Sequence, residues 1–265
     1  MKRKLIAILA AAAMLLTFAP AVSAADVGNC VDIVGNEHKI AGKGSYDRNN
    51  IAGIEAVIDP ANTGSDDLCH NPGLALNNGV FHTVTVGAIN AGGTIPKLLS
   101  LGVVDCDNPL GTGCERNVWH YFVQAVACDT QGDLTVDLGK ANNPWNPHTY
   151  KIFFNYSNST WEFSIDGVKK YTLYTTLSLY SCYNMNNGKT MRGIIQSERE
   201  DLGDAWSGTN DSTDFTQARV YIGGGNWAWP SSVACYYNNH SFFPHYQGCN
   251  SPVNGYSSMQ TWTIY

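Results

Sequence analysis

One strand-like segment carries carboxylates at a spacing that suits acid–base chemistry. In the run from Met191 to Asp201, β alternation puts Gln196, Glu198 and Glu200 on one face. Glu198 and Glu200 then lie roughly 7 Å apart at a rise of ~3.3 Å per residue, a separation found for the carboxylate pairs of inverting glycosidases. Solvated charges on an ordinary strand face have the same spacing, so other groups must join the pair to make a site.

A second segment, from Val118 to Val126, supplies the possible partners. Alternation places His120 and Gln124 on one of its faces. If the two segments face one groove, Glu198 is the acid/base, His120 is a titratable imidazole, and Gln124 or Gln196 is an amide that polarises a carbonyl. The alternative is an ordinary strand with a hydrogen-bonded histidine and glutamine, because a sequence gives no distance between strands.

The C-terminal residues 223–265 are dense in aromatic side chains. Trp227 and Trp229 share a face if the glycines before them lead into a strand, and their rings then suit stacking on the C–H faces of sugars. With Glu200, these two residues are the candidate ligand-binding residues, because sugars present apolar faces and hydroxyl rims together. Burial in strand packing is the alternative use of such rings.

The metal-binding patterns are incomplete. Acidic residues occur in Gly/Asn-rich stretches, but the D-x-[DN]-x-[DN]-G pattern of a calcium loop is absent. Neither a CxxC pair nor an HExxH motif occurs. We therefore expect no metal and no cofactor.

The N-terminus combines cations, an apolar run and a small-residue cleavage site. Three cations near the start precede an apolar run that ends at Phe18, and Val22-Ser-Ala24 fits signal peptidase. We expect residues 1–24 to be a removed signal peptide and residues 25–265 to be one secreted domain with no membrane anchor. Residues 223–265 are expected to be its aromatic, disulfide-stapled C-terminal part.

All eight cysteines follow the expected cleavage site, and an even number in an exported chain indicates four disulfides. They are Cys30, Cys69, Cys106, Cys114, Cys128, Cys182, Cys235 and Cys249. The sequence leaves their pairing open, although two pairs close short loops at little entropic cost: Cys106 with Cys114, and Cys235 with Cys249.

Charge narrows the class of partner. The formal charge is −6, and removal of the three signal-peptide cations leaves −9 for the secreted chain. An acidic balance argues against nucleic acid as a partner. A glycan or another extracellular polymer fits the aromatic and amide side chains better, and the oligomeric state stays open.

Period-two alternation with little helix signal predicts one antiparallel β sandwich. The clearest hairpin is His148–Asn155 followed by Trp161–Asp166, in which Trp161, Phe163 and Ile165 face the core. Further β-rich runs cover residues 54–58, 82–89, 118–127, 170–179, 191–200, 215–222 and 259–265. Many strands joined by polar turns are typical of an all-β sandwich or barrel.

The hairpin is similar to the H-x-Y-x-I … W-x-F-x-I-D-G pattern common in concanavalin A-like lectin/glucanase sandwiches. The order of further pieces resembles the glutamic peptidase (eqolisin-type) branch of that architecture. These pieces are Thr83–Ile89 with Leu98–Val103, Val118–Gln124, Ile194–Glu198 and Asp214–Val220. The resemblance implies a two-sheet jelly roll, and it implies that Glu198 stands where the family carries its catalytic glutamate.

One departure from that family concerns its catalytic glutamine. Ser100 occupies the corresponding position, in Leu99-Ser-Leu-Gly-Val103. A serine hydroxyl does not replace an amide that polarises a peptide carbonyl. We therefore predict a secreted, non-catalytic protein that binds a glycan or another polymer. The alternatives are a glutamic-type endopeptidase or a glycoside-active enzyme that uses Glu198 with a glutamine partner, and an extracellular structural protein.

Overall fold

A computed structural model gives the fold of the chain. It describes residues 39–49, 51–60, 78–88, 97–107, 118–128, 134–144, 146–187, 190–199, 213–222, 226–228, 234–236, 245–253 and 256–263. Side chains are described for residues 51–60, 81–87, 97–104, 118–128, 134–144, 146–177, 179–186, 191–197 and 213–222. The expected signal peptide lies outside the described residues.

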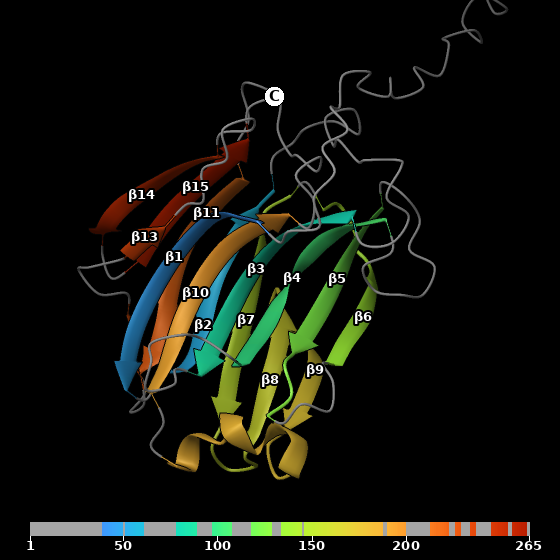
Figure 1. Cartoon of the computed structure of the whole chain (residues 1–265), viewed down its shortest axis with the longest axis vertical. Helices are drawn as coiled ribbons and strands as arrows, with labels where there is room; N and C mark the ends of the chain where they lie inside the picture. The colour runs from blue at the N-terminus through green and yellow to red at the C-terminus, as the bar shows by residue number, and fades with distance from the viewer. Residues whose placement is uncertain are drawn as a thin grey trace, which may run out of the picture.

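Two antiparallel sheets form the molecule, and Figure 1 shows one in front of the other. The front sheet has the order β13 (Ala234–Tyr236), β1 (Lys39–Asn49), β10 (Thr190–Arg199), β3 (Asn78–Ala88), β4 (Lys97–Asp107), β5 (Val118–Ala125) and β6 (Leu134–Lys140). The back sheet has the order β14 (His245–Val253), β15 (Tyr256–Thr263), β11 (Thr213–Ile222), β2 (Ile51–Asp59), β7 (His148–Asn155), β8 (Thr160–Ile165) and β9 (Val168–Tyr174). The short β12 (Asn226–Ala228) pairs with β11 outside this path.

The predicted all-β, two-sheet sandwich is confirmed, and each predicted run overlaps a strand. The run predicted for residues 170–179 is wrong at its end, because β9 stops at Tyr174 and residues Ser178–Tyr183 form the 3₁₀ helix η1. A second short 3₁₀ helix, η2, covers Met185–Asn187. Two bonds hold this segment next to Cys128 and away from the edge of the back sheet. Cys182 forms a disulfide with Cys128, and the Cys128 N–H donates a hydrogen bond to the Leu179 carbonyl.

The core lies between the sheets and follows the period-two alternation of each strand. As predicted, Trp161, Phe163 and Ile165 of β8 are buried in it. On β5 the core residues are Trp119, Tyr121, Val123 and Ala125. The strands β2, β3, β4, β7 and β10 add Ile54, Ala56, Ile58, Val84, Val86, Leu99, Leu101, Val103, Tyr150, Ile152, Phe154, Met191 and Ile195.

A buried histidine bridges the two sheets. His82 of β3 is fully buried, and its Nδ1 lies 2.8 Å from the hydroxyl of Ser197 on β10. Its Nε2 lies 3.3 Å from the hydroxyl of Thr213 on β11 in the back sheet. The imidazole also stacks on Trp119, with 5.6 Å between ring centroids. Burial lowers the pKa of His82 from 6.5 to about 3, so the ring is neutral at physiological pH.

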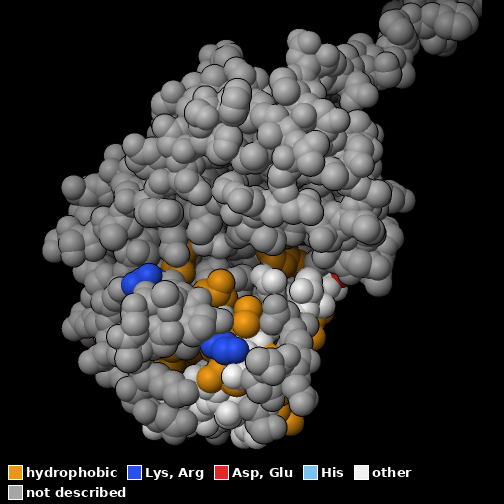
Figure 2. Space-filling model, in the orientation of Figure 1, with side chains coloured by type: hydrophobic (Ala, Val, Ile, Leu, Met, Phe, Trp, Pro, Cys, Tyr) orange, Lys and Arg blue, Asp and Glu red, His pale blue; other side chains and the backbone are white. Residues whose placement is uncertain are grey.

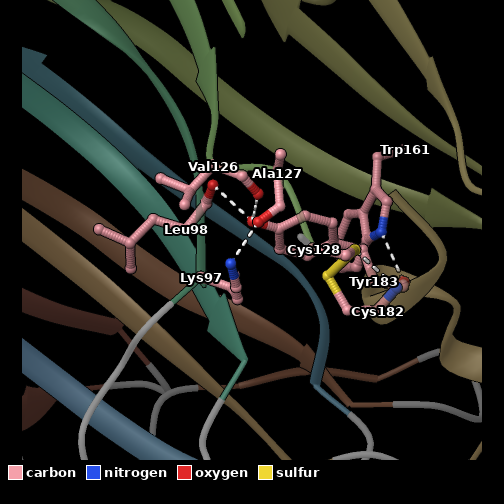
Figure 3. Close-up of a disulfide and its surroundings, with 8 residues drawn as sticks. All are labelled: Lys97, Leu98, Val126, Ala127, Cys128, Trp161, Cys182 and Tyr183. Atoms are coloured by element: carbon pink, nitrogen blue, oxygen red, sulfur yellow. Dashed lines mark hydrogen bonds between the residues drawn. A yellow bond between two sulfur atoms is a disulfide. The ribbon is translucent and has the colours of Figure 1, made fainter. Parts of the chain in front are cut away.

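A disulfide closes the lower end of the sandwich (Figure 3). Cys128 follows β5, and Cys182 lies in η1, 54 residues later. Beside it, the buried Tyr183 hydroxyl lies 2.6 Å from the Val126 carbonyl, and the Tyr183 carbonyl accepts a hydrogen bond from the Trp161 indole at 2.9 Å. The 3₁₀ segment is therefore held to both sheets.

Candidate functional site

Three of the predicted catalytic residues, His120, Gln124 and Gln196, occupy the face of the front sheet that points away from the back sheet, which we call the outer face of the front sheet. For Glu198 the structure describes the backbone position on β10 alone. The residues of this face alternate with core residues along β10, β3, β4, β5 and β6. The pairing of neighbouring strands places these outward residues opposite one another, in rows that run across the strands. The rows contain Glu198, Phe81, Val104 and His120; then Gln196, Thr83, Gly102 and Phe122; then Ile194, Thr85, Ser100 and Gln124.

The centre of this face is polar and buried. The Ser100 hydroxyl lies 2.9 Å from the hydroxyl of Thr85, which lies 3.4 Å from that of Thr83. Gln196, opposite Thr83 on β10, is also buried. The residue at the glutamine position of the resemblance, Ser100, is thus part of a hydroxyl chain within the sheet.

The face becomes accessible towards its edge at β6. His120 Nδ1 lies 3.0 Å from a carboxylate oxygen of Asp137, and the Gly139 N–H donates to the same oxygen at 2.7 Å. The His120 side chain is 14% exposed and that of Asp137 is 30% exposed. Gln124 is half-buried, and its neighbour Thr135 on β6 is exposed. Polar groups near this edge can therefore reach a ligand.

Figure 2 views this side of the molecule. The described side chains visible in the lower part of the view are largely apolar, with Lys or Arg groups among them. Apart from what this view shows, the buried Val104, Phe122 and Ile194 occupy outward positions of the front sheet and are not part of the core between the sheets. The face thus combines apolar and polar groups.

The register does not bring Gln124 or His120 next to Glu198. The strands β10 and β5 are separated by β3 and β4, and three spacings of about 4.8 Å put the backbone of His120 about 14 Å from that of Glu198. Gln124 is four residues further along β5, which places it about 20 Å from Glu198. Gln196 alone of the candidate amides remains near, two residues from Glu198 on the same strand. The Glu198 side chain lies outside the described side chains.

One of the two aromatic candidates, Trp227, belongs to the other sheet. Trp227 lies on β12, opposite Tyr221 of β11. It is therefore part of the back sheet, whereas His120 and Gln124 are part of the front sheet. Trp229 and Glu200 lie outside the described residues. Trp227 thus does not share a sheet with His120 and Gln124.

Sequence reasoning missed two partnerships that shape this region. It did not connect His120 with Asp137, although the alternating apolar residues of Leu134-Thr-Val-Asp-Leu138 are a signal for a neighbouring strand. It also did not select Cys128 with Cys182, whose Cα atoms lie 5.6 Å apart. That pair closes a long loop, for which spacing gives no signal.

The pairings favoured from spacing lie outside the described side chains. Cys106, Cys235 and Cys249 are placed by their backbone in β4, β13 and β14. Cys114, Cys30 and Cys69 lie outside the described residues altogether. The Cys128–Cys182 bond nevertheless shows that this fold uses its cysteines for at least one cross-link.

The described residues contain neither a metal-binding cluster nor a membrane-spanning helix. Within them, no group of three or more His, Cys, Asp or Glu side chains is placed to hold a metal ion. No helix in this part of the chain has the length and apolar character to cross a membrane.

Comparisons with known proteins bear on the fold. No protein-family model matches the chain, and no curated protein matches it in sequence. The structure is similar to scytalido-glutamic peptidase bound to a peptide-based transition-state analogue, with a TM-score of 0.50 and 12% identity over 86% of this chain and 98% of that one. A laminarinase catalytic domain from Thermotoga petrophila gives a TM-score of 0.37 and 8% identity over 82% of this chain and 63% of that one. The likeness to the peptidase shows the concanavalin A-like jelly roll that the sequence pattern implied.

Proposed function

We propose that this chain is a secreted, non-catalytic module that binds a glycan or another extracellular polymer at the outer face of the front sheet. The observation that carries the proposal is the hydrogen bond between the hydroxyls of Ser100 and Thr85. The Ser100 hydroxyl stands where a glutamic peptidase has an amide, and it is bound to Thr85 within the sheet. The nearest amide on the neighbouring strand β5 is that of Gln124, and the backbone of Gln124 is about 20 Å from that of Glu198. The face therefore keeps polar groups that can contact a ligand, whereas Ser100 and Gln124 do not supply the amide that a glutamic peptidase pairs with its glutamate.

The accessible edge at β5 and β6 is the part of this face that suits binding. Gln124 provides an amide that both donates and accepts, Thr135 a hydroxyl, and Asp137 a carboxylate oriented by His120. These groups lie along one side of an extended strand pair. An extended polymer that lies along the strands can form hydrogen bonds to these groups one after another, through its sugar hydroxyls or its peptide groups.

Secretion belongs to the same proposal. The expected signal peptide and the even number of cysteines support it. The Cys128–Cys182 bond is of the kind that persists in oxidising compartments.

The peptidase alternative depends on Gln196, because this amide shares a strand with Glu198. Two residues along a strand span about 7 Å, a distance that one bound water and two side chains can bridge. Gln196 is buried, and it faces Thr83 across the ladder. In this alternative Glu198 activates the water and Gln196 holds the substrate carbonyl.

Two assays on the full secreted chain separate these functions. A glycan array probes binding, with Gln124→Ala as the site variant and Lys170→Ala on exposed β9 as the matched control. Digestion of denatured casein at acidic and neutral pH probes hydrolysis, with Glu198→Gln as its control. We expect array binding that weakens several-fold in Gln124→Ala alone, and no casein cleavage. Cleavage that disappears in Glu198→Gln would establish the peptidase, and silence in both assays would leave a structural role.

A further inference from the structure

A histidine joins two loops of the sandwich, away from the proposed binding face. His148 is the first residue of β7, and its ring contacts both the turn that follows β8 and the connection from β6 to β7. Its Nδ1 lies 2.6 Å from a carboxylate oxygen of Asp166 in that turn. Its Nε2 lies 3.2 Å from the backbone carbonyl oxygen of Asn143 in that connection. We call these two contacts the His148 bridge.

The two partners of the ring decide its protonation state. An ionised carboxylate and a backbone carbonyl accept hydrogen bonds, and neither has a hydrogen to donate. Each ring nitrogen must therefore carry a proton to bond its partner, and an imidazole with two N–H groups is a cation. A neutral ring has one N–H, so it turns a lone pair towards one of the two oxygens. The complete His148 bridge thus belongs to the imidazolium form.

Asp166 is arranged to bind a cation. The Thr149 N–H donates to its other carboxylate oxygen at 2.8 Å, and a hydrogen bond of this kind favours the ionised form. Carboxylates in general are ionised between pH 5.5 and pH 8.5. In this range the proton that comes and goes is therefore the one on the histidine ring.

The other ionisable side chains packed against the ring are tyrosines. Tyr121 of β5 meets the imidazole almost at a right angle, with 5.9 Å between ring centroids, and Tyr150 contacts Tyr121 at 6.2 Å. Burial raises the pKa of both hydroxyls, and the negative charge of Asp166 raises both further. Both tyrosines are therefore neutral where histidine side chains titrate. On β2 the residue opposite His148 is the apolar Ile58.

The connection from β6 to β7 makes a tight turn at the second partner of the bridge. Asn143 has a φ of 49°, a left-handed conformation that residues other than glycine seldom adopt. Its carbonyl oxygen accepts the Asn146 N–H at 2.9 Å as well as the His148 ring. The Ala141 N–H donates to the Trp119 carbonyl at 2.8 Å, which holds the end of β6 in place. Loss of the contact at Asn143 therefore concerns the residues between Ala141 and His148.

We propose that the His148 bridge is a pH-sensitive switch of the β6–β7 connection. In the imidazolium form the ring holds Asn143 against the turn at Asp166. When the ring loses a proton, it keeps its N–H on the carboxylate, which is the stronger acceptor, and it releases the Asn143 carbonyl. The closed connection binds the additional proton, so it is favoured at low pH and is lost as the pH rises. The switch does not depend on whether the front sheet binds a ligand.

NMR of the full chain tests the switch without a ligand. Two-bond proton–nitrogen spectra distinguish the imidazolium from the neutral ring, and the His148 signals are those that disappear in His148→Gln. The protection factor of the Asn146 amide, which removes the intrinsic pH dependence of hydrogen exchange, reports the closed turn at Asn143. The matched control is His120→Gln. His120 also contacts an aspartate through Nδ1, but the described residues offer its Nε2 no hydrogen-bond partner.

We expect His148 to be an imidazolium at pH 5.5 and to lose a proton as the pH rises to 8.5. The Asn146 protection factor should fall about tenfold with the same midpoint, because one hydrogen bond to a charged group is lost. In His148→Gln the protection factor should not depend on pH, and in His120→Gln it should follow the wild type.

Three results would overturn the proposal. They are a neutral His148 ring at pH 5.5, a wild-type protection factor that does not fall at the midpoint of the ring titration, and a fall that persists in His148→Gln. If His148→Gln does not fold, the first two results still decide the matter on the wild-type protein, with the His148 signals assigned through the spectrum of the neighbouring residues.

Discussion

Asp166 accepts two hydrogen bonds from the beginning of β7: His148 Nδ1 lies 2.6 Å from one carboxylate oxygen, and the Thr149 N–H donates to the other at 2.8 Å. His148 and Asp166 stand at the two ends of the hairpin pattern H-x-Y-x-I … W-x-F-x-I-D-G. The bond between them explains why a histidine and an aspartate 18 residues apart belong to one pattern. The hydrogen bonds of Asp166 hold the turn after β8 against the beginning of β7.

Replacement of Asp166 should therefore loosen this hairpin. Asp166 has a φ of 50°, a conformation that Asn tolerates and Ala does not. We expect Asp166→Ala to lower the free energy of unfolding by about 2 kcal/mol, and Asp166→Asn by less than about 1 kcal/mol, because Asn keeps an acceptor and the backbone conformation. Urea denaturation measures both. Equal losses in the two variants would contradict this role of the acceptor.

Stability should depend on pH through His82. Its pKa is about 3 in the folded protein and about 6.5 in the unfolded chain, so between these values the unfolded chain binds a proton that the folded protein does not. Stability is then complete above pH 6.5 and falls as the pH drops towards 3, by at most about 1.4 kcal/mol per pH unit from this group.

Two measurements check the role of His82. Urea midpoints from pH 7 to pH 4 should fall less steeply in His82→Gln than in the wild type. If that variant does not fold, the His82 ring in the native protein should show no NMR titration down to pH 4. A titration near pH 6.5 would show that the ring is accessible.

The fold was largely predictable because it rests on short-range alternation. Trp161, Phe163 and Ile165 point into the core as their spacing indicates, and His148–Asn155 has its predicted bounds. Among the strands that were missed, two have a clear physical reason. β1 (Lys39–Asn49) and β14 (His245–Val253) are polar and glycine-containing, and they become strands through pairing with β10 and β15 rather than through their own pattern.

The site was less predictable because strand order is a long-range property. Alternation placed His120, Gln124 and Gln196 on outward positions, but nothing in the sequence says that β3 and β4 separate β5 from β10. The same limit applies to Trp227, whose position opposite Tyr221 assigns it to the other sheet. Distances across a sheet follow from pairing order, which local pattern does not encode.

Loss of the Cys128–Cys182 disulfide should strongly destabilise the protein. The bond closes a loop with a sequence separation of 54 residues, for which the chain-entropy relation gives about 4 kcal/mol. We expect the double variant Cys128→Ala/Cys182→Ala to lose about that much stability in urea denaturation and to become protease-sensitive around Ser178–Tyr183 first. A loss below about 1 kcal/mol would show that the hydrogen bonds of Tyr183 suffice to hold this end.

At Gly193 the front sheet lies close against side chains of the back sheet. A Cβ at this position would stand 2.6 Å from Val220 Cγ1 and 3.5 Å from Ile54 Cδ1 in the back sheet. We expect Gly193→Ala to lower the free energy of unfolding by about 1–3 kcal/mol through overpacking, as measured by urea denaturation.

The double variant Gly193→Ala/Val220→Ala identifies the cause of that loss. Val220→Ala alone should be destabilising, because it leaves a cavity in the core, but in the double variant the new methyl group occupies part of the space that Val220 vacates. The double variant should therefore be more stable than the sum of the two single losses predicts, by about 0.5–3 kcal/mol. Strict additivity would mean that the sheets do not meet at these two residues.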